Sequence, residues 1–108
     1  GMQSAIDRLG ALKERFKRVS IDDKGSQFNT DVLEAIELGN LLDTAEIVAV
    51  SGIARKESRG AHAREDFTER DDVKFLQHTF ATKDVNGKIA LDYKPATITK
   101  YQPKKRVY

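Results

Sequence analysis

Residues 29–60 read NTDVLEAIELGNLLDTAEIVAVSGIARKESRG, and this stretch decides the fold because its apolar residues recur at the spacing of a helix. The positions of the apolar stripe are Val32, Leu33, Ile36, Leu41, Leu42, Ala45, Val48 and Ile53. Asn29 or Thr30 can cap the first free amides, and Gly60 can end the helix. The pattern therefore predicts a helix that continues to about Arg59 and is about 40 Å long.

A shorter amphipathic helix is expected before this one. Its apolar residues lie three and four positions apart, at Ile6, Leu9, Leu12, Phe16 and Val19, and they predict about five helical turns. Residues 22–26, DDKGS, are typical of a loop. Phe28 is expected to staple onto Leu33 at the start of the long helix. Two helices cover each other's stripes only in part, so we expect an antiparallel helical bundle that receives a further surface from upstream.

The remaining residues, 61–108, have a different character. Residues 61–72 are almost wholly polar around Phe67 and predict an irregular loop, and a short helix from Asp71 or Asp72 to Gln77 can follow. Asn86-Gly87 separates two extended segments, 78–85 and 88–93, and predicts a β-hairpin with a type I′ turn. Residues 96–99 can add a short edge strand. The expected class is mainly α, with residues 1–60 as two long helices and residues 61–108 as loop, short helix, β-hairpin and extended tail of the same domain.

Composition excludes several kinds of protein. The chain has 108 residues, 19 Lys and Arg against 17 Asp and Glu, and no cysteine. This balance gives no general argument for nucleic acid, and disulfides, thiolate nucleophiles and zinc–thiolate sites are excluded. No stretch approaches the roughly 18 apolar residues of a membrane span. We expect an intracellular, metal-free protein, and Gly1 before Met2 resembles an expression scar, so the chain is expected to be a chosen fragment.

No complete catalytic or cofactor site is expected in this chain. His62 and His78 are the two histidines, and their separation does not direct both at one metal ion. Neither has a Ser/His/Asp or Cys/His arrangement around it. The glycines are scattered and form no phosphate-binding loop. The run Lys104-Lys105-Arg106 offers only a weak footprint for nucleic acid.

The densely charged stretch from Arg55 to Asp72 is more informative. Its ordinary interpretation is a solvated loop. A docking surface is the better interpretation, because guanidinium groups can fork onto carboxylates and carbonyls, and such groups repay their desolvation only when both partners are in place. The residues that we expect to dock against an outside partner are Arg59, His62, Arg64, Asp66, Arg70 and Asp71.

The same stretch carries a family resemblance. Residues 55–67, RKESRGAHAREDF, followed by 69–72, ERDD, resemble the C-terminal signature of succinate dehydrogenase and fumarate reductase flavoprotein subunits. Thr68 stands where the family commonly has Pro, and Phe75 where it commonly has Trp. The further segments that carry the resemblance are 28–31 (FNTD), 37–42 (ELGNLL), 75–79 (FLQHT) and 105–108 (KRVY).

The resemblance implies a spectrin-repeat-like helical bundle with a small β tail, packed against the FAD-binding domain of a subunit that interconverts succinate and fumarate. It implies that FAD and the substrate-binding residues lie upstream, that an iron–sulfur subunit receives the electrons, and that this chain alone is inactive. It also implies a cytoplasmic location, on the membrane face, through the parent complex.

Two alternatives stay open. L-Aspartate oxidases share the Glu-Ser-Arg-Gly element at residues 57–60 but lack the Arg-Glu-Asp continuation at 64–66. An independent helical interaction module, acting through the basic tail, is the alternative from another class. Uncovered apolar stripes also predict that the chain can form a homo-oligomer.

Overall fold

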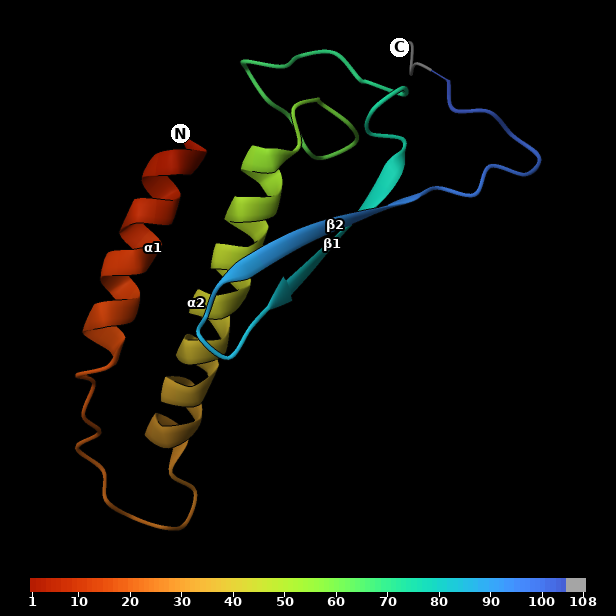
Figure 1. The fold of residues 1–108 in the computed structure, drawn as a ribbon. Helices are drawn as coiled ribbons and strands as arrows, with labels where there is room; N and C mark the ends of the chain where they lie inside the picture. The colour runs from red at the N-terminus through yellow and green to blue at the C-terminus, as the bar shows by residue number, and fades with distance from the viewer. Residues whose placement is uncertain (105–108) are drawn as a thin grey trace.

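The computed structural model describes residues 1–104 as a helical hairpin followed by a β-hairpin (Figure 1). The elements in chain order are α1 (Met2–Phe16), α2 (Thr30–Ala54), β1 (Gln77–Lys83) and β2 (Ile89–Pro95). The two helices run antiparallel side by side, and the β-hairpin crosses α2 (Figure 1). The expected mainly α class, a helical bundle with a C-terminal β-hairpin, is confirmed. Residues 105–108, which include most of the basic tail and the KRVY segment, lie outside the described residues.

Helix α1 ends at Phe16, so the prediction that it continues to Val19 was wrong by about one turn. Beyond Phe16 the backbone tightens, and the amides of Arg18 and Val19 donate to the carbonyls three residues earlier, at 3.0 Å each. Such i→i+3 bonds satisfy the last carbonyls of a helix while turning the chain out of it.

Helix α2 begins as predicted and ends earlier than predicted. The Asn29 side chain accepts from the Val32 amide at 3.1 Å, which confirms the N-cap. The helix ends at Ala54 instead of Arg59, because Arg55 is already extended (φ −83°, ψ 100°). Gly60 does not end the helix but lies in a separate turn with a φ of +59°.

The expected staple between Phe28 and Leu33 does not form. Phe28 has a φ of +50° and is 99% exposed, so its ring points away from the first turn of α2. The left-handed backbone conformation is stabilised by the Asn29 carboxamide, which donates to the carbonyls of Asp23 and Gly25 at 2.9 Å each.

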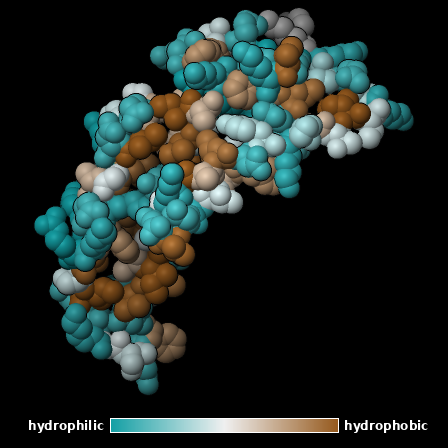
Figure 2. All heavy atoms as spheres, viewed as in Figure 1, coloured by the Kyte–Doolittle hydropathy of each residue, from teal (hydrophilic) through white to brown (hydrophobic). Residues whose placement is uncertain are grey.

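The helices touch along a thin core. Leu42 is the one buried apolar side chain among residues 1–104, at 8% exposure. Gly39 faces the Phe16 ring so closely that a Cβ there would lie 3.0 Å from the ring, so the ring would have to shift to admit a side chain. Much apolar surface of α2 stays uncovered, notably at Leu33, Ile36, Leu41 and Val48. Figure 2 accordingly shows brown apolar spheres at the surface of the helical hairpin.

The β-hairpin lies where the sequence predicts it, with a different turn. Strands β1 and β2 pair antiparallel from Gln77 opposite Pro95 to Lys83 opposite Ile89. Gly87 has a φ of +82°, but Asn86 is not among the positive-φ residues, so the turn is not type I′. The Gly87 amide donates to the Asp84 carbonyl at 3.0 Å, as in a type I turn followed by a left-handed glycine.

Two smaller predictions for the second half were wrong. Instead of a short helix after Asp71 there is a single turn, in which the Phe75 amide donates to the Asp71 carbonyl at 3.0 Å. Residues 96–99 form no strand. The Ala96 amide still donates to the Leu76 carbonyl at 3.1 Å and adds one bond beyond the paired strands.

An ionic cluster attaches the β-hairpin to both helices. Lys13 of α1 and Lys83 of β1 contact the carboxylate of Asp43 on α2 at 2.8 and 2.6 Å. Glu46, one turn further along α2, lies 2.6 Å from Lys13 and 3.4 Å from Lys83. Hydrogen bonds from Lys13 and then Lys83 lower the pKa of Asp43 to about 2. The hairpin is therefore held against α2 by charge as well as by packing.

Candidate functional site, the arginine loop

Residues 55–72, here called the arginine loop, are organised around the carboxylate of Glu57. Its side chain has no exposed surface. It accepts from Nε of Arg55 at 2.8 Å, from Nε of Arg59 at 3.0 Å and from the backbone amide of Asp71 at 2.8 Å. Burial works to raise the pKa of Glu57, but the bonds from Arg59, the Asp71 amide and Arg55 outweigh it and hold that pKa below its usual range. Glu57 thus stays ionised and ties both ends of the loop together.

The network continues from Glu57 to the far end of the loop. Arg59 Nη2 lies 2.7 Å from Asp72 Oδ1, and Arg70 donates from Nε to the other oxygen of Asp72 at 3.0 Å. Arg70 also donates to the carbonyl of Lys104 at 2.8 Å. Charge-assisted hydrogen bonds of this kind are among the stronger hydrogen bonds in proteins. The groups that they join are alternately negative and positive, in the order Glu57, Arg59, Asp72 and Arg70.

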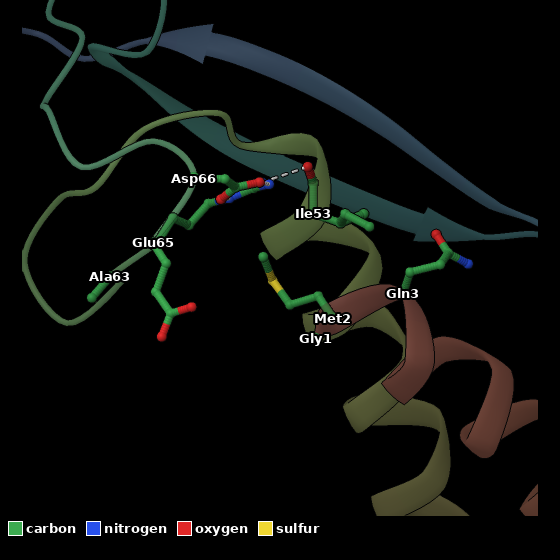
Figure 3. Close-up of a pocket in the computed structure, with 8 residues that line it drawn as sticks. Gly1, Met2, Gln3, Ile53, Ala63, Glu65 and Asp66 are labelled. Carbon is green, nitrogen blue, oxygen red and sulfur yellow. Dashed lines mark hydrogen bonds and ion pairs between the residues drawn. The ribbon is translucent and has the colours of Figure 1, made fainter.

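Arg64 caps the C-terminus of α2. Its Nη1 donates to the carbonyls of Gly52, Ile53 and Arg55 at 3.2, 2.8 and 3.1 Å. Figure 3 draws the bond to Ile53 as a dashed line. Its other nitrogens form a fork with the two oxygens of Asp66, at 2.8 and 2.6 Å. The last carbonyls of a helix have no partner inside the helix, and a cation is favoured at its negative end. This is the physical reason why α2 stops at Ala54.

Arg55 joins the loop to the β-hairpin. Its Nη1 donates to the Gln77 carbonyl and to the Thr79 hydroxyl, both at 3.1 Å, and Nη2 donates to the Phe75 carbonyl. One side chain therefore links the end of α2, Glu57 and the start of β1. The first residue of the loop is therefore bonded directly to the β-hairpin.

The backbone inside the loop is fixed by short-range bonds. Arg59 and His62 exchange amide–carbonyl bonds at 2.8 and 3.0 Å around Gly60. The Ser58 hydroxyl accepts from the Arg64 amide at 2.8 Å and donates to the Phe67 carbonyl at 2.7 Å. These bonds give the loop one defined shape.

Comparison with known proteins agrees with this geometry. The family model described as fumarate reductase flavoprotein C-term matches residues 1–108. The chain belongs to this family. It is 56% identical over 107 residues to a fumarate reductase flavoprotein subunit of Haemophilus influenzae, and 57% identical over 109 residues to one of Escherichia coli. A succinate dehydrogenase flavoprotein subunit of Rickettsia bellii is 42% identical over 114 residues.

Solved structures give the same assignment. An Escherichia coli quinol fumarate reductase chain has a TM-score of 0.91 at 56% identity and covers 99% of this chain and 19% of that chain. A quinol–fumarate reductase with menaquinol molecules has a TM-score of 0.86 at 54% identity and covers 94% of this chain and 18% of that one. The first two sequence relatives are each matched over 99% of this chain and 18% of their own length. The chain therefore spans about a fifth of these relatives, and the resemblance read from the sequence is confirmed.

The family's signature residues all lie in the arginine loop, but their partners differ from those expected. The guanidinium groups of Arg59, Arg64 and Arg70 bind carboxylates and carbonyls of this same chain. His62 Nε2 lies 3.2 Å from the Arg55 carbonyl, and the carboxylate of Asp71 accepts from the amides of the following turn. These groups therefore do not need an outside partner to be satisfied. That the six residues expected to dock also contact another protein surface stays a prediction.

Sequence reasoning missed the centre of the site. Arg55, Glu57, Ser58 and Asp72 were not among the expected docking residues, yet they hold the loop together. The available signal was the spacing Arg-x-Glu-x-Arg at residues 55–59, in which one carboxylate lies between two arginines. A carboxylate in that position can be shared by both guanidinium groups when the chain is extended.

A pocket of about 540 Å³ lies where the loop meets the start of α1, and its polar lining includes Arg64 and Asp66, which already bind each other (Figure 3). The exposed His78 lies on β1 and His62 lies in the arginine loop, and no group of His, Asp or Glu within residues 1–104 is arranged to hold a metal ion. Residues 1–104 also contain no helix that is long and apolar enough to cross a membrane.

Proposed function

We propose that this chain is the C-terminal scaffold and docking domain of a flavoprotein subunit that interconverts succinate and fumarate. In this proposal FAD and the substrate-binding residues belong to the rest of the parent subunit, and the chain alone is inactive. The observation that carries the proposal is the match of the whole chain to the C-terminal family of fumarate reductase flavoproteins. Because the relatives are about five times longer, their activity is carried over only as part of the proposal.

The arginine loop is the proposed docking surface. Arg59, Arg64 and Asp71 shape it from within, since their polar groups bind the chain itself. The side chain of Asp66 is 61% exposed although it pairs with Arg64, whose side chain is 6% exposed. A loop that is already ordered loses little conformational entropy on binding, which favours a stable interdomain contact.

We propose two partners for the chain in the assembled enzyme. The FAD-binding domain of the same subunit packs against the arginine loop, and an iron–sulfur subunit accepts electrons from the flavin. Support comes from the match to quinol fumarate reductase structures. The proposed location follows from this assembly, on the cytoplasmic face of the membrane. Self-association of the isolated chain through the uncovered apolar surface of α2 stays a prediction.

The first experiment tests docking without removing any bond inside the loop. Ala61 is exposed at the tip of the Arg59–His62 turn, so Ala61→Arg adds bulk and charge there while the internal bonds stay in place. In the full-length parent subunit we expect Ala61→Arg to lower flavin retention and succinate-dependent dye reduction. Ala11→Arg, at an exposed position on α1, is the matched control and should leave both unchanged. Equal behaviour of the two variants would contradict the docking surface.

A second experiment tests the scaffold role itself. This chain is expressed together with the parent flavoprotein truncated before the segment that the chain matches, and the two are purified through a tag on one of them. Recovery of a complex with bound FAD and succinate-dependent dye reduction supports the proposal. A chain that stays monomeric and does not associate would instead support an independent interaction module.

A further inference from the structure

The loop between α1 and α2 holds an aromatic side chain in solvent. Phe28 is 99% exposed, and its φ of +50° makes it the one non-glycine residue with a left-handed backbone among residues 1–104. Bulky residues rarely adopt this conformation, which persists only where the surroundings impose it. Asn29 imposes it, because its side chain donates to two carbonyls of the loop and accepts from the Val32 amide. The loop is thus built to present the Phe28 ring outward.

A partly apolar groove with an acidic rim lies at the same end of the helical hairpin. Its volume is about 470 Å³, and Val19, Ile21, Ala35 and Leu38 supply its apolar surface. The carboxylates of Asp22, Asp31 and Glu34 line it as well. None of the described lining residues is basic. The apolar surface in this region is visible over the helices in Figure 2.

The charges of the groove indicate the chemistry of its occupant. Asp31 lies in the first turn of α2, where the helix dipole favours a carboxylate. Asp22 lies outside the helix and Glu34 lies one turn beyond Asp31, where the dipole acts less, and neither forms an ion pair within residues 1–104. A second copy of this acidic surface or an anionic membrane would be repelled, whereas a Lys or Arg beside an apolar side chain would complement both features.

We infer that this end of the helical hairpin is a second docking point, which receives a basic and apolar polypeptide segment from the rest of the parent subunit. An apolar side chain of that segment enters the groove, its Lys or Arg meets Asp22 and Glu34, and the segment covers the Phe28 ring. The inference rests on the proposed function, because it requires a parent subunit to which the chain is joined.

The position of the second docking point indicates what a contact there would do. Helix α2 has 25 residues, so its two ends lie about 37 Å apart. The arginine loop is at one end of α2, and the segment that joins α1 to α2 is at the other (Figure 1). That segment contains Phe28 and contributes Val19, Ile21 and Asp22 to the groove. A helical hairpin that is held only at the arginine loop can rotate about that contact. A contact at each end of the helical hairpin fixes its orientation. The two contacts together would set the angle between the helical hairpin and the domain that binds the flavin.

The first test uses a photo-cross-linking residue. p-Benzoylphenylalanine replaces Phe28 in the full-length parent subunit, the protein is irradiated, and the linked peptides are identified by mass spectrometry. We expect a link to a segment outside residues 1–108 that carries Lys or Arg next to apolar residues. Links confined to residues 1–108, or none, would overturn the inference.

The same probe at Ala61 separates this inference from the proposed function. Ala61 lies in the arginine loop and reports on the first docking surface. If Ala61 links outside the chain and Phe28 does not, the second docking point is wrong and the proposed function stands. If neither position links outside the chain, both are wrong.

A pair of charge reversals tests the acidic rim. Glu34→Lys places a cation in the groove, and Glu37→Lys makes the same change at an exposed glutamate that does not line it. In the full-length subunit Glu34→Lys should lower Tm by several degrees more than Glu37→Lys. The difference should shrink in 1 M salt. The change in Tm of each variant is also measured in the isolated chain and subtracted from the change in the full-length subunit, which removes the helix-dipole contribution. Equal remaining changes for the two variants would refute the basic occupant.

Discussion

The carboxylate of Glu57 and the backbone amide of Asp71 are joined by a hydrogen bond of 2.8 Å, although 14 positions separate them in the chain. Because Glu57 also accepts from Arg55 and Arg59, its charge is the point at which the exit from α2 meets the approach to β1. Removal of that charge takes the shared anion away from two guanidinium groups, which keep their other acceptors, and weakens the bond from the Asp71 amide.

Glu57→Gln should therefore be the most damaging single change in the arginine loop. We expect the free energy of unfolding of the chain to fall by about 3 kcal/mol, the size found when one partner of a buried ion pair is removed. Urea unfolding followed by circular dichroism measures it. Lys56→Ala, at the exposed neighbouring position, is the control and should change stability by less than about 0.5 kcal/mol. A loss for Glu57→Gln as small as the control's would contradict the central role of this carboxylate.

Two Gly→Ala replacements should change the free energy of unfolding in opposite directions. Gly10 lies in α1, and a Cβ at this position would have no atom within 4 Å, so Gly10→Ala should stabilise the chain by about 0.5–1 kcal/mol through backbone entropy alone. A Cβ on Gly39 would lie 3.0 Å from the Phe16 ring, so Gly39→Ala should destabilise it by about 1 kcal/mol once overpacking exceeds the gain in helix propensity. Thermal unfolding of both variants distinguishes the signs. Stabilisation by both would mean that α1 and α2 are not packed this closely.

The Lys13, Asp43 and Lys83 contacts predict acid sensitivity in one pH window. The folded-state pKa of Asp43 is about 2, below the ordinary 3.8, because of hydrogen bonds from Lys13 and Lys83. The ionised carboxylate stabilises the fold above about pH 4, and this contribution is lost as the pH falls towards 2. Asp43→Asn should reduce the slope of stability against pH between those values. An unchanged slope would show that the cluster does not form in solution.

The N-cap of α2, Asn29, gives a prediction about the end of the helical hairpin where α1 is joined to α2. Asn29→Ala removes the acceptor of the Val32 amide and two donors to the loop carbonyls, so we expect a loss of about 1–2 kcal/mol. Asn40→Ala, in the middle of the same helix, lacks any capping role and is the matched control. Hydrogen exchange should locate the effect at the first turn of α2. Faster exchange along the whole helix would instead indicate a global loss of packing.

Local patterns predicted the elements well because each has a strong local cause. The frequent apolar residues of α2, the capping Asn29 and the Asn86-Gly87 turn all act over a few residues. The end of α2 is different. Lys56, Glu57 and Ser58 tolerate a helix, and what ends it is Arg64, a residue ten positions beyond Ala54 that binds the last carbonyls. A sequence window does not reveal that competition.

The type of the Asn86-Gly87 turn and the central role of Glu57 could not be predicted from the sequence for the same reason. Asn86-Gly87 favours type I′, but the Asp84 carboxylate accepts from the amides of Asn86 and Lys88 at 2.9 and 2.8 Å and stabilises another turn. Glu57 resembles a surface charge until Arg55, Arg59 and the Asp71 amide close around it. The charged stretch was recognised correctly as the informative one, while its internal pairing depends on contacts up to 14 residues apart.

The arginine loop also has a thermal consequence. Its shape is maintained by ionic and hydrogen-bonding groups around Glu57, so local opening of the loop would expose mainly polar surface. Polar exposure lowers the heat capacity of the opened state, whereas apolar exposure raises it. The free energy of opening this loop should therefore vary less with temperature than that of separating α1 from α2. On cooling, the contact between the two helices should weaken first, and the loop should keep its shape.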